Sequence, residues 1–172
     1  MALHSGRPLV AVTRGLYVAR AAMREAQEVQ TRTHPTGEVA RCDLLDRYAK
    51  AWVKGDARAV AALLRADTTL SVPPRVWLRG PSRIAHFLRE EVFPHAGMRF
   101  LATRSNGMDA FGVYLRSPSP PHPFEPHSLQ VVELLDGAVG SITCFLDPAL
   151  LTRFGMPDNV SDSWPIHSAH ES

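Results

Sequence analysis

Two side chains of this sequence could transfer a proton near neutral pH. His127 precedes the largely apolar run 128–135 and directly follows a proline-rich stretch. An unperturbed imidazole titrates close to physiological pH. Tyr114 lies in a second apolar run, 110–116, where its phenol could donate or accept a hydrogen bond. Neither residue belongs to a recognisable catalytic motif, so His127 and Tyr114 are candidate proton-transfer groups only.

Three further polar side chains interrupt apolar runs and could contact a bound molecule. They are Gln130, Thr143 and Cys144, which carry an amide, a hydroxyl and a thiol. A cysteine is a nucleophile only as the thiolate, and no basic residue stands beside Cys144 in the sequence. Cys144 is therefore interpreted either as a ligand contact or as a small buried apolar residue.

Motifs for metals and cofactors are missing from the sequence. Cys42 and Cys144 lie far apart and do not have the close spacing of a zinc site. We expect both to be reduced thiols, because the sequence shows no secretory signal. A glycine-rich phosphate loop, a nucleophile elbow and a dinucleotide fingerprint are also missing. We therefore predict neither a metal nor a cofactor.

The bulk composition limits the class of protein. The chain has 172 residues, of which 45% are hydrophobic, which suits one core plus terminal extensions. The formal net charge of +2 is too small to argue for direct binding of nucleic acid. No apolar run is long enough to span a bilayer. These features predict a cytoplasmic domain that binds neither nucleic acid nor membrane.

Apolar residues at helical spacing predict two helices, 42–54 and 56–64, followed by a third. Gly55 fits the position just after the first helix, and Asp56 fits the N-cap of the second. The third helix should begin at Ser82. Its buried side would consist of Ile84, Phe87, Leu88 and Val92.

Apolar and β-branched runs predict strands later in the chain. The dipeptides Asn106-Gly107 and Asp136-Gly137 predict tight hairpin turns. The proline-rich stretch 117–123 excludes regular strand pairing. The predicted strands are 69–72, 98–104, 110–116, 128–135 and 139–145.

Composition shifts suggest three parts of the chain. Residues 16–30 are rich in helix formers, and 31–37 then break the pattern. We predict a helical extension and linker at 1–37 and one globular domain at 38–157. The polar tail 158–172 is predicted to be disordered.

Short segments distributed over residues 45–148 resemble a known family. The resemblance is to the SnoaL-like branch of the nuclear transport factor 2-like superfamily, and above all to the SnoaL-like C-terminal domain of actinobacterial extracytoplasmic-function sigma factors. The segments include Leu45-Asp46-Arg47-Tyr48, Leu63-Leu64-Arg65-Ala66-Asp67, Trp77-Leu78-Arg79-Gly80, Ala110-Phe111-Gly112-Val113-Tyr114 and Phe145-Leu146-Asp147-Pro148.

The resemblance implies an α+β fold shaped like a cone. Three helices would pack on a strongly curved, mostly antiparallel sheet and enclose a pocket. Its apolar walls would include Trp52, Trp77 and Phe100. Each of these aromatic side chains could either pack in the core or stack on a ligand. Enzymes of this superfamily carry a deep carboxylate on the last strand, and the matching position here is Cys144. His127 would lie at the mouth of the pocket.

Function remains open between classes, because one fold hosts many activities. One reading is a ligand-binding or regulatory module related to sigma-factor accessory domains, with sigma factor or RNA polymerase as partner. The chain has no room for a complete sigma factor and is not expected to act as one. The alternative is a small cofactor-independent cyclase, isomerase or hydrolase for an apolar polyketide-like substrate, using His127 or Tyr114. A third reading is a pocket that only sequesters an apolar molecule, and in each case we expect a homodimer.

Overall fold

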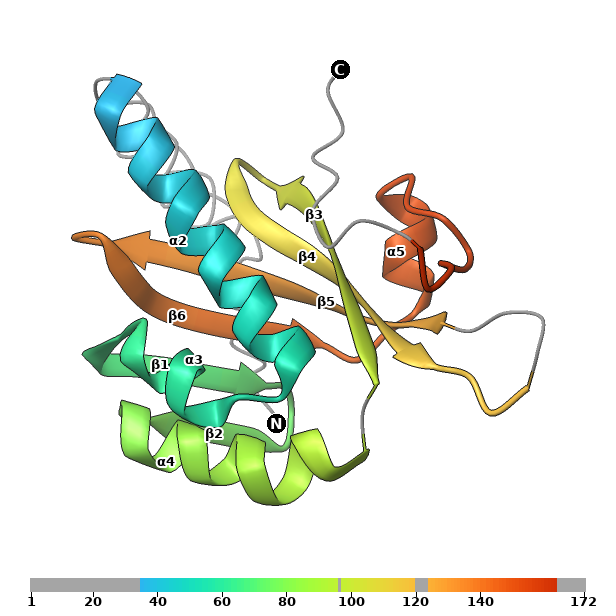
Figure 1. Ribbon diagram of the computed structural model, residues 1–172, viewed down its shortest axis with the longest axis horizontal. Helices are drawn as coiled ribbons and strands as arrows, with labels where there is room; N and C mark the ends of the chain where they lie inside the picture. The colour runs from blue at the N-terminus through green and yellow to red at the C-terminus, as the bar shows by residue number, and fades with distance from the viewer. Residues whose placement is uncertain (1–34, 96, 120–123, 164–172) are drawn as a thin grey trace, which may run out of the picture. The chain divides into compact units, whose positions relative to one another are not determined.

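The computed structural model describes residues 35–95, 97–119 and 124–163, and it divides the chain into two units, 1–38 and 39–172. The second unit contains the sheet (Figure 1). The helix predicted within 16–30 lies outside the described residues, as does part of the proline-rich stretch.

The first two helices follow the predicted pattern of caps. Helix α2 (Pro35–Lys54) ends just before Gly55, whose φ of +68° is the left-handed conformation that glycine adopts easily. Helix α3 (Ala57–Ala62) begins after Asp56, whose carboxylate accepts a hydrogen bond of 2.9 Å from the amide of Ala59. The predicted caps are confirmed. The second helix ends earlier than predicted, because the chain enters a strand at Leu64.

The third helix has the predicted buried side, with Ile84 and Leu88 buried and Phe87 and Val92 packed against the same cluster, but only its first part is α-helical. Helix α4 (Pro81–Phe87) continues into a π-helical turn (Leu88–Val92) and a short 3₁₀ turn (Phe93–His95). Proline 94 lacks a backbone donor, so it cannot extend an α-helix. A further short helix, α5 (Ala149–Arg153), was not predicted.

Six strands form one mixed sheet in the order β2-β1-β6-β5-β4-β3. Strands β1 and β6 are parallel, and the other neighbouring pairs are antiparallel. The α+β class and the mostly antiparallel sheet are thus confirmed. The strands are β1 (Leu64–Val72), β2 (Val76–Arg79), β3 (Met98–Ser105), β4 (Met108–Arg116), β5 (Phe124–Leu135) and β6 (Ala138–Phe145).

Two differences from the expected cone concern the sheet. Strand β2 was not among the predicted strands, and it pairs with β1 across the turn at Pro73-Pro74. The sheet is not strongly curled, and it is open, with β2 and β3 as its two edges. The predicted hairpin turns are confirmed, with positive φ angles at Asn106-Gly107 and Asp136-Gly137.

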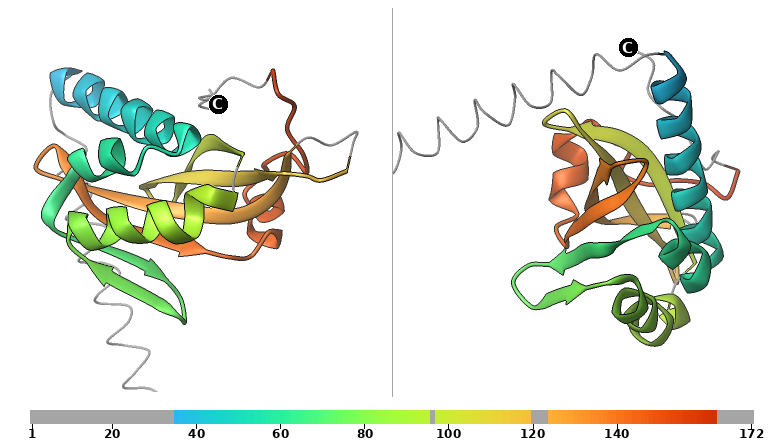
Figure 2. Two further views of the ribbon diagram at one scale, coloured as in Figure 1. Left: turned by 60° about the horizontal axis from the view of Figure 1, so that its bottom comes forward. Right: turned by 90° about the vertical axis from the view of Figure 1, so that its left-hand side faces the viewer.

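The sheet buries a separate apolar cluster on each face. Strand alternation sends Phe111 and Val113 to the cluster that includes α2, and Tyr114 to the cluster that includes Leu151 of α5. Figure 2 shows α2 and α5 on opposite sides of the sheet. The face under α2 is called the helix face below, and the face under α5 is called the outer face.

The chain stays packed beyond the expected end of the domain at residue 157. Val160 is buried, and its amide donates a 3.1 Å hydrogen bond to the carbonyl of Phe124. The first residues of the predicted tail therefore belong to the folded domain, because the apolar side chain of Val160 packs on the outer face. Residues 164–172 lie outside the described part.

Candidate functional site

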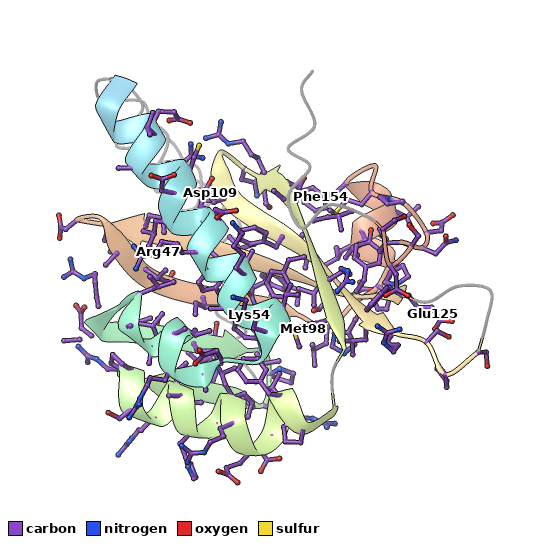
Figure 3. The ribbon with its side chains drawn as sticks, viewed as in Figure 1. Arg47, Lys54, Met98, Asp109, Glu125 and Phe154 are labelled. Carbon is purple, nitrogen blue, oxygen red and sulfur yellow. The ribbon has the colours of Figure 1, made fainter. Side chains whose placement is uncertain are left out.

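Helix α2 is held over the sheet by a charged contact near one end of β4. The guanidinium of Arg41 donates to the carboxylate of Asp109, with 3.0 Å between Nε and Oδ2. Figure 3 shows Asp109 beside the helix. Both side chains are largely buried, so this contact is less screened by water than a surface pair. It fixes the position from which α2 presents its apolar face.

That apolar face brings aromatic rings together on the helix face of the sheet. Tyr48 and Trp52 lie one helical turn apart, and their ring centroids are 5.9 Å apart. Trp52 also packs on Phe100 of β3 at 5.6 Å, and Tyr48 stacks on Phe111 of β4 at 5.9 Å. Such pairs lie in the range where aromatic rings attract one another. The predicted wall residues Trp52 and Phe100 are thus brought into contact.

A buried chain of polar groups adjoins these rings. The hydroxyl of Tyr48 donates to Oε1 of Gln130 at 2.6 Å, and the amide of Gln130 donates to the thiol sulfur of Cys144 at 3.3 Å. Gln130 on β5 and Cys144 on β6 are direct partners in the sheet register. All three residues are buried. Polar groups in such a place are normally hydrogen-bonded, and here each one is.

This polar chain carries no charge at neutral pH. Burial raises the pKa of the Tyr48 hydroxyl well above its usual value; the nearby Cys144 adds to the rise, and the Trp52 indole opposes it. Burial also raises the pKa of the Cys144 thiol to about 11, against the opposing hydrogen bond from Gln130. Both groups therefore stay protonated. Cys144 is not available as a thiolate nucleophile.

One polar group beside the chain is poorly paired. The indole Nε1–H of Trp52 is buried and makes no hydrogen bond of normal geometry among the described residues, although the indole lies close enough to the Tyr48 hydroxyl to affect its pKa. Trp52 itself is only 5% exposed. An unpartnered buried donor costs free energy and calls for an explanation, such as a missing acceptor. The site thus offers one donor without a well-formed hydrogen bond, next to a neutral polar chain, inside an aromatic cluster.

Two of the predicted contact residues lie elsewhere. Thr143 is on β6 between Ile142 and Cys144, which both join the helix-face cluster, so its side chain points to the outer face. Its hydroxyl accepts a 3.2 Å hydrogen bond from Ser71. Trp77 is 71% exposed on the edge strand β2. Neither is gathered with Gln130 and Cys144.

Tyr114 also faces away from the polar chain. Its side chain belongs to the outer-face cluster, and its hydroxyl donates a 2.7 Å hydrogen bond to the carbonyl of Pro157. Burial, with a smaller contribution from the charge of Asp158, raises the pKa of this hydroxyl to about 12. Tyr114 therefore anchors the chain after α5 and is poorly suited to release a proton.

His127 stands where β5 departs from regular pairing with β4. The register shifts beside Val113 and Tyr114, and Nδ1 of His127 lies 3.1 Å from the hydroxyl of Ser128. Burial lowers the pKa of this imidazole. A histidine with a lowered pKa is neutral at pH 7. The described residues show no hydrogen bond from His127 to Gln130 or Cys144.

Tyr48 is the member of the polar chain that the sequence analysis missed. Its spacing placed it on the apolar face of the first helix, which the structure confirms. The available signal was its hydroxyl, since a buried tyrosine usually finds a hydrogen-bond partner. A glutamine within the apolar run of β5 was the natural candidate for that partner.

The described residues provide neither a metal-binding cluster nor a membrane-spanning helix. Within the described residues, no three histidine, cysteine or acidic side chains are grouped so that they could hold a metal ion. The helices of that same part are too short or too polar to cross a membrane. Cys42 is exposed and Cys144 is buried, and both are free thiols.

Comparison with curated proteins agrees with the resemblance seen in the sequence. The chain is similar to the ECF RNA polymerase sigma factor SigG of Mycobacterium tuberculosis, with 28% identity over 121 residues, in two strains. The match covers 69% of this chain and 32% of the sigma factor. The chain thus spans about a third of the length of these relatives. No family model matches the chain.

Comparison with solved structures identifies the fold. An NTF2-like protein of unknown function from Burkholderia xenovorans aligns with a TM-score of 0.53 and 14% identity, over 68% of this chain and 94% of its own. A de novo designed protein with a curved β-sheet aligns with a TM-score of 0.51 and 14% identity, over 69% and 93% of the two chains. The chain has an NTF2-like fold.

Removing the Tyr48 hydroxyl should destabilise the protein. Tyr48→Phe leaves Oε1 of Gln130 buried without its donor, so we expect a loss of about 1–3 kcal/mol in the free energy of unfolding. In the double variant Tyr48→Phe with Gln130→Met, no amide is left unpaired, and part of the loss should be recovered. Urea denaturation measures both. Equal or greater loss in the double variant would contradict a coupled polar pair.

The two thiols should differ sharply in reactivity. In the folded protein at pH 7.5, we expect Ellman's reagent to modify Cys42 rapidly and Cys144 only after denaturant is added, because Cys144 is buried and protonated. The absorbance of the thiolate released from the reagent gives the number of reacted thiols. In Cys42→Ser, no thiol of the folded protein should react rapidly. A fast reaction in that variant would mean that Cys144 is accessible or ionised.

Proposed function

We propose that this NTF2-like domain binds an apolar small molecule that carries a hydrogen-bond acceptor such as a carbonyl group. The observation that supports the proposal is the Nε1–H of Trp52, which lies beside the buried polar chain and makes no hydrogen bond of normal geometry. The aromatic rings of Phe100 and Phe111, whose centroids lie 5.5 Å apart, would supply apolar walls, and a ligand would have to part this packed cluster to enter it. A ligand carbonyl would accept the hydrogen bond that Trp52 lacks.

The protonation states favour binding over proton transfer. The superfamily enzymes that the sequence resembles use a deep carboxylate, and Cys144 stands at that position with a protonated thiol. A neutral thiol and a neutral phenol orient a ligand but do not act as a base at pH 7. The alternative, a cofactor-independent cyclase, isomerase or hydrolase, would depend on His127, because the Tyr114 hydroxyl is engaged with Pro157.

A regulatory role is the second part of the proposal. The similarity to SigG supports a relation to an accessory module of sigma factors. Sigma factor or RNA polymerase would then be the macromolecular partner, and occupancy of the ligand site would change that contact.

A homodimer is proposed on the exposed part of the outer face. Trp77 on β2 is 71% exposed, and Phe145 on β6 is 40% exposed. Register pairing aligns Trp77 with Ser71 and Ser71 with Thr143, two residues before Phe145, so both aromatic side chains leave the same face. Exposed aromatic side chains gathered on one face are typical of protein interfaces.

Ligand binding should raise the thermal stability of the wild-type protein. We expect at least one member of a panel of apolar polycyclic ketones and lactones to raise Tm, with about 2.7 kcal/mol of stabilisation at a hundred times its Kd. Trp52→Phe retains an aromatic ring but removes the donor, and should weaken binding about tenfold.

Two results of the ligand experiment would count against the proposal. One is a panel without any Tm shift, and the other is unchanged affinity in Trp52→Phe. Product analysis with wild type and His127→Ala separates binding from catalysis, since turnover lost in that variant would favour the enzyme alternative.

Assembly should depend on the exposed aromatic face. In sedimentation velocity experiments, the wild-type chain alone should sediment as a dimer. When it is mixed with purified RNA polymerase holoenzyme, the chain should sediment together with the holoenzyme. Trp77→Glu should shift the dimer to monomer, because a buried unpaired charge at an interface is costly. Val39→Glu, at a 63% exposed position on α2, is the matched control and should remain dimeric. A monomeric wild type would contradict the dimer, and a holoenzyme peak without bound chain would contradict the partner.

A further inference from the structure

The outer face is crossed by the chain's own extended segment, residues 156–162, called the strap below. It follows α5 and lies on strands β4 and β5. Met156 is buried against Gly112 of β4, where an added Cβ would come within 2.5 Å of the methionine methyl group. Only glycine leaves room for this contact. The next fixed point is the carbonyl of Pro157, which accepts from Tyr114.

The middle of the strap binds as an added piece of strand. The Val160 amide donates to the carbonyl of Phe124 at the start of β5, and the two residues form an antiparallel bridge. The side chain of Val160 is 1% exposed, in the apolar cluster with Tyr114 and Phe124. A backbone hydrogen bond combined with a side-chain socket is the way in which many domains bind extended peptides.

The end of the strap binds to two arginines on one aromatic ring. The Cζ atoms of Arg99 and Arg116 lie 4.6 and 4.7 Å from the centroid of the Phe124 ring. The carboxylate of Asp162 lies 3.5 Å from Arg99 and 3.2 Å from Arg116, and its backbone carbonyl accepts from Arg99 at 3.3 Å. Nε of Arg99 is buried and has no hydrogen-bond partner among the described residues.

These contacts do not balance in charge. Two guanidinium groups meet the one carboxylate of Asp162, and the Nε–H of Arg99 remains unused. The site could therefore take more negative charge than the strap provides. Asp162 is 61% exposed, and ion pairs of that kind contribute little to stability. The charged end of the strap is thus held weakly, although the site around it is well formed.

We propose that Phe124, Arg99, Arg116 and the socket of Val160 form a docking site for an extended acidic peptide of a partner protein, and that the strap occupies it in cis. The recognised pattern is an apolar residue followed two positions later by a carboxylate. Here Val160 enters the apolar cluster, and the chain then turns so that Asp162, two positions later, reaches the two arginines. A second acidic residue in the partner peptide would use the remaining arginine donors.

The apparent affinity of the docking site for a partner peptide depends on competition with the strap. A segment tethered beside its own site acts at an effective concentration in the millimolar range. A free peptide of equal intrinsic affinity therefore binds only when the strap is weakened. This proposal is independent of the ligand site, because the two sites lie on opposite faces of the sheet.

The test uses the full chain and a peptide with the sequence of residues 158–163, acetylated and amidated at its ends. Asp162→Asn weakens the strap, and ¹⁵N NMR follows the amide of Phe124 and the Nε–H of Arg116 during the titration. We expect half-saturation at a peptide concentration about two- to fivefold lower in Asp162→Asn than in wild type, as the loss of an exposed ion pair implies. In Asp162→Asn, the Val160 amide should also exchange with deuterium faster by a similar factor, about two- to fivefold.

Two controls make the result specific. The peptide with asparagine at the position of Asp162 should bind Asp162→Asn about two- to fivefold more weakly than the unaltered peptide. Adding Arg116→Gln should weaken binding of the unaltered peptide by a similar factor, about two- to fivefold. Arg116 is 53% exposed, so this change should leave the fold intact. Equal peptide binding by wild type and Asp162→Asn would overturn occupation in cis. The docking site would be overturned if Arg116→Gln left the affinity for the peptide unchanged, or if the peptide did not bind to Asp162→Asn.

Discussion

Both faces of the central strands are apolar, and the rest of the structure depends on covering them. Along β4, the side chains of Phe111 and Val113 point to one face. The side chain of Tyr114 points to the other, where Met156 packs against Gly112. Period-two alternation means that a single layer of helices cannot bury both sets. Helix α2 covers the first face, and α5 with the strap covers the second. The segment after α5 is therefore part of the fold.

The two covered faces differ in the chemistry that they offer. The helix face holds a neutral polar chain from Tyr48 to Cys144 among aromatic rings, so it discriminates by hydrogen bonding and shape. The edge of the outer face holds the guanidinium groups of Arg99 and Arg116 near water. Charge is tolerated there because solvent reaches it, whereas the buried chain must stay uncharged.

Local signals in the sequence were sufficient for much of the fold. The cap at Asp56 and the turns at Asn106-Gly107 and Asp136-Gly137 were predicted because each depends on one or two residues and their immediate neighbours. Strand β2 and helix α5 escaped prediction, since each is short and carries no long periodic pattern. Their place is decided by pairing with β1 and packing on the outer face, which are contacts with distant parts of the chain.

The sequence by itself determined which side chains are available: a glutamine and a cysteine on late strands, aromatic rings on the first helix, and no metal or cofactor motif. Only the tertiary structure decided which of them meet. Gln130 and Cys144 became partners through the register of β5 and β6, and Tyr48 reached them from a helix far away in the chain. Tyr114 and Thr143 turned to the opposite face, because side chains alternate along a strand and only register and packing choose which face is covered by which helix.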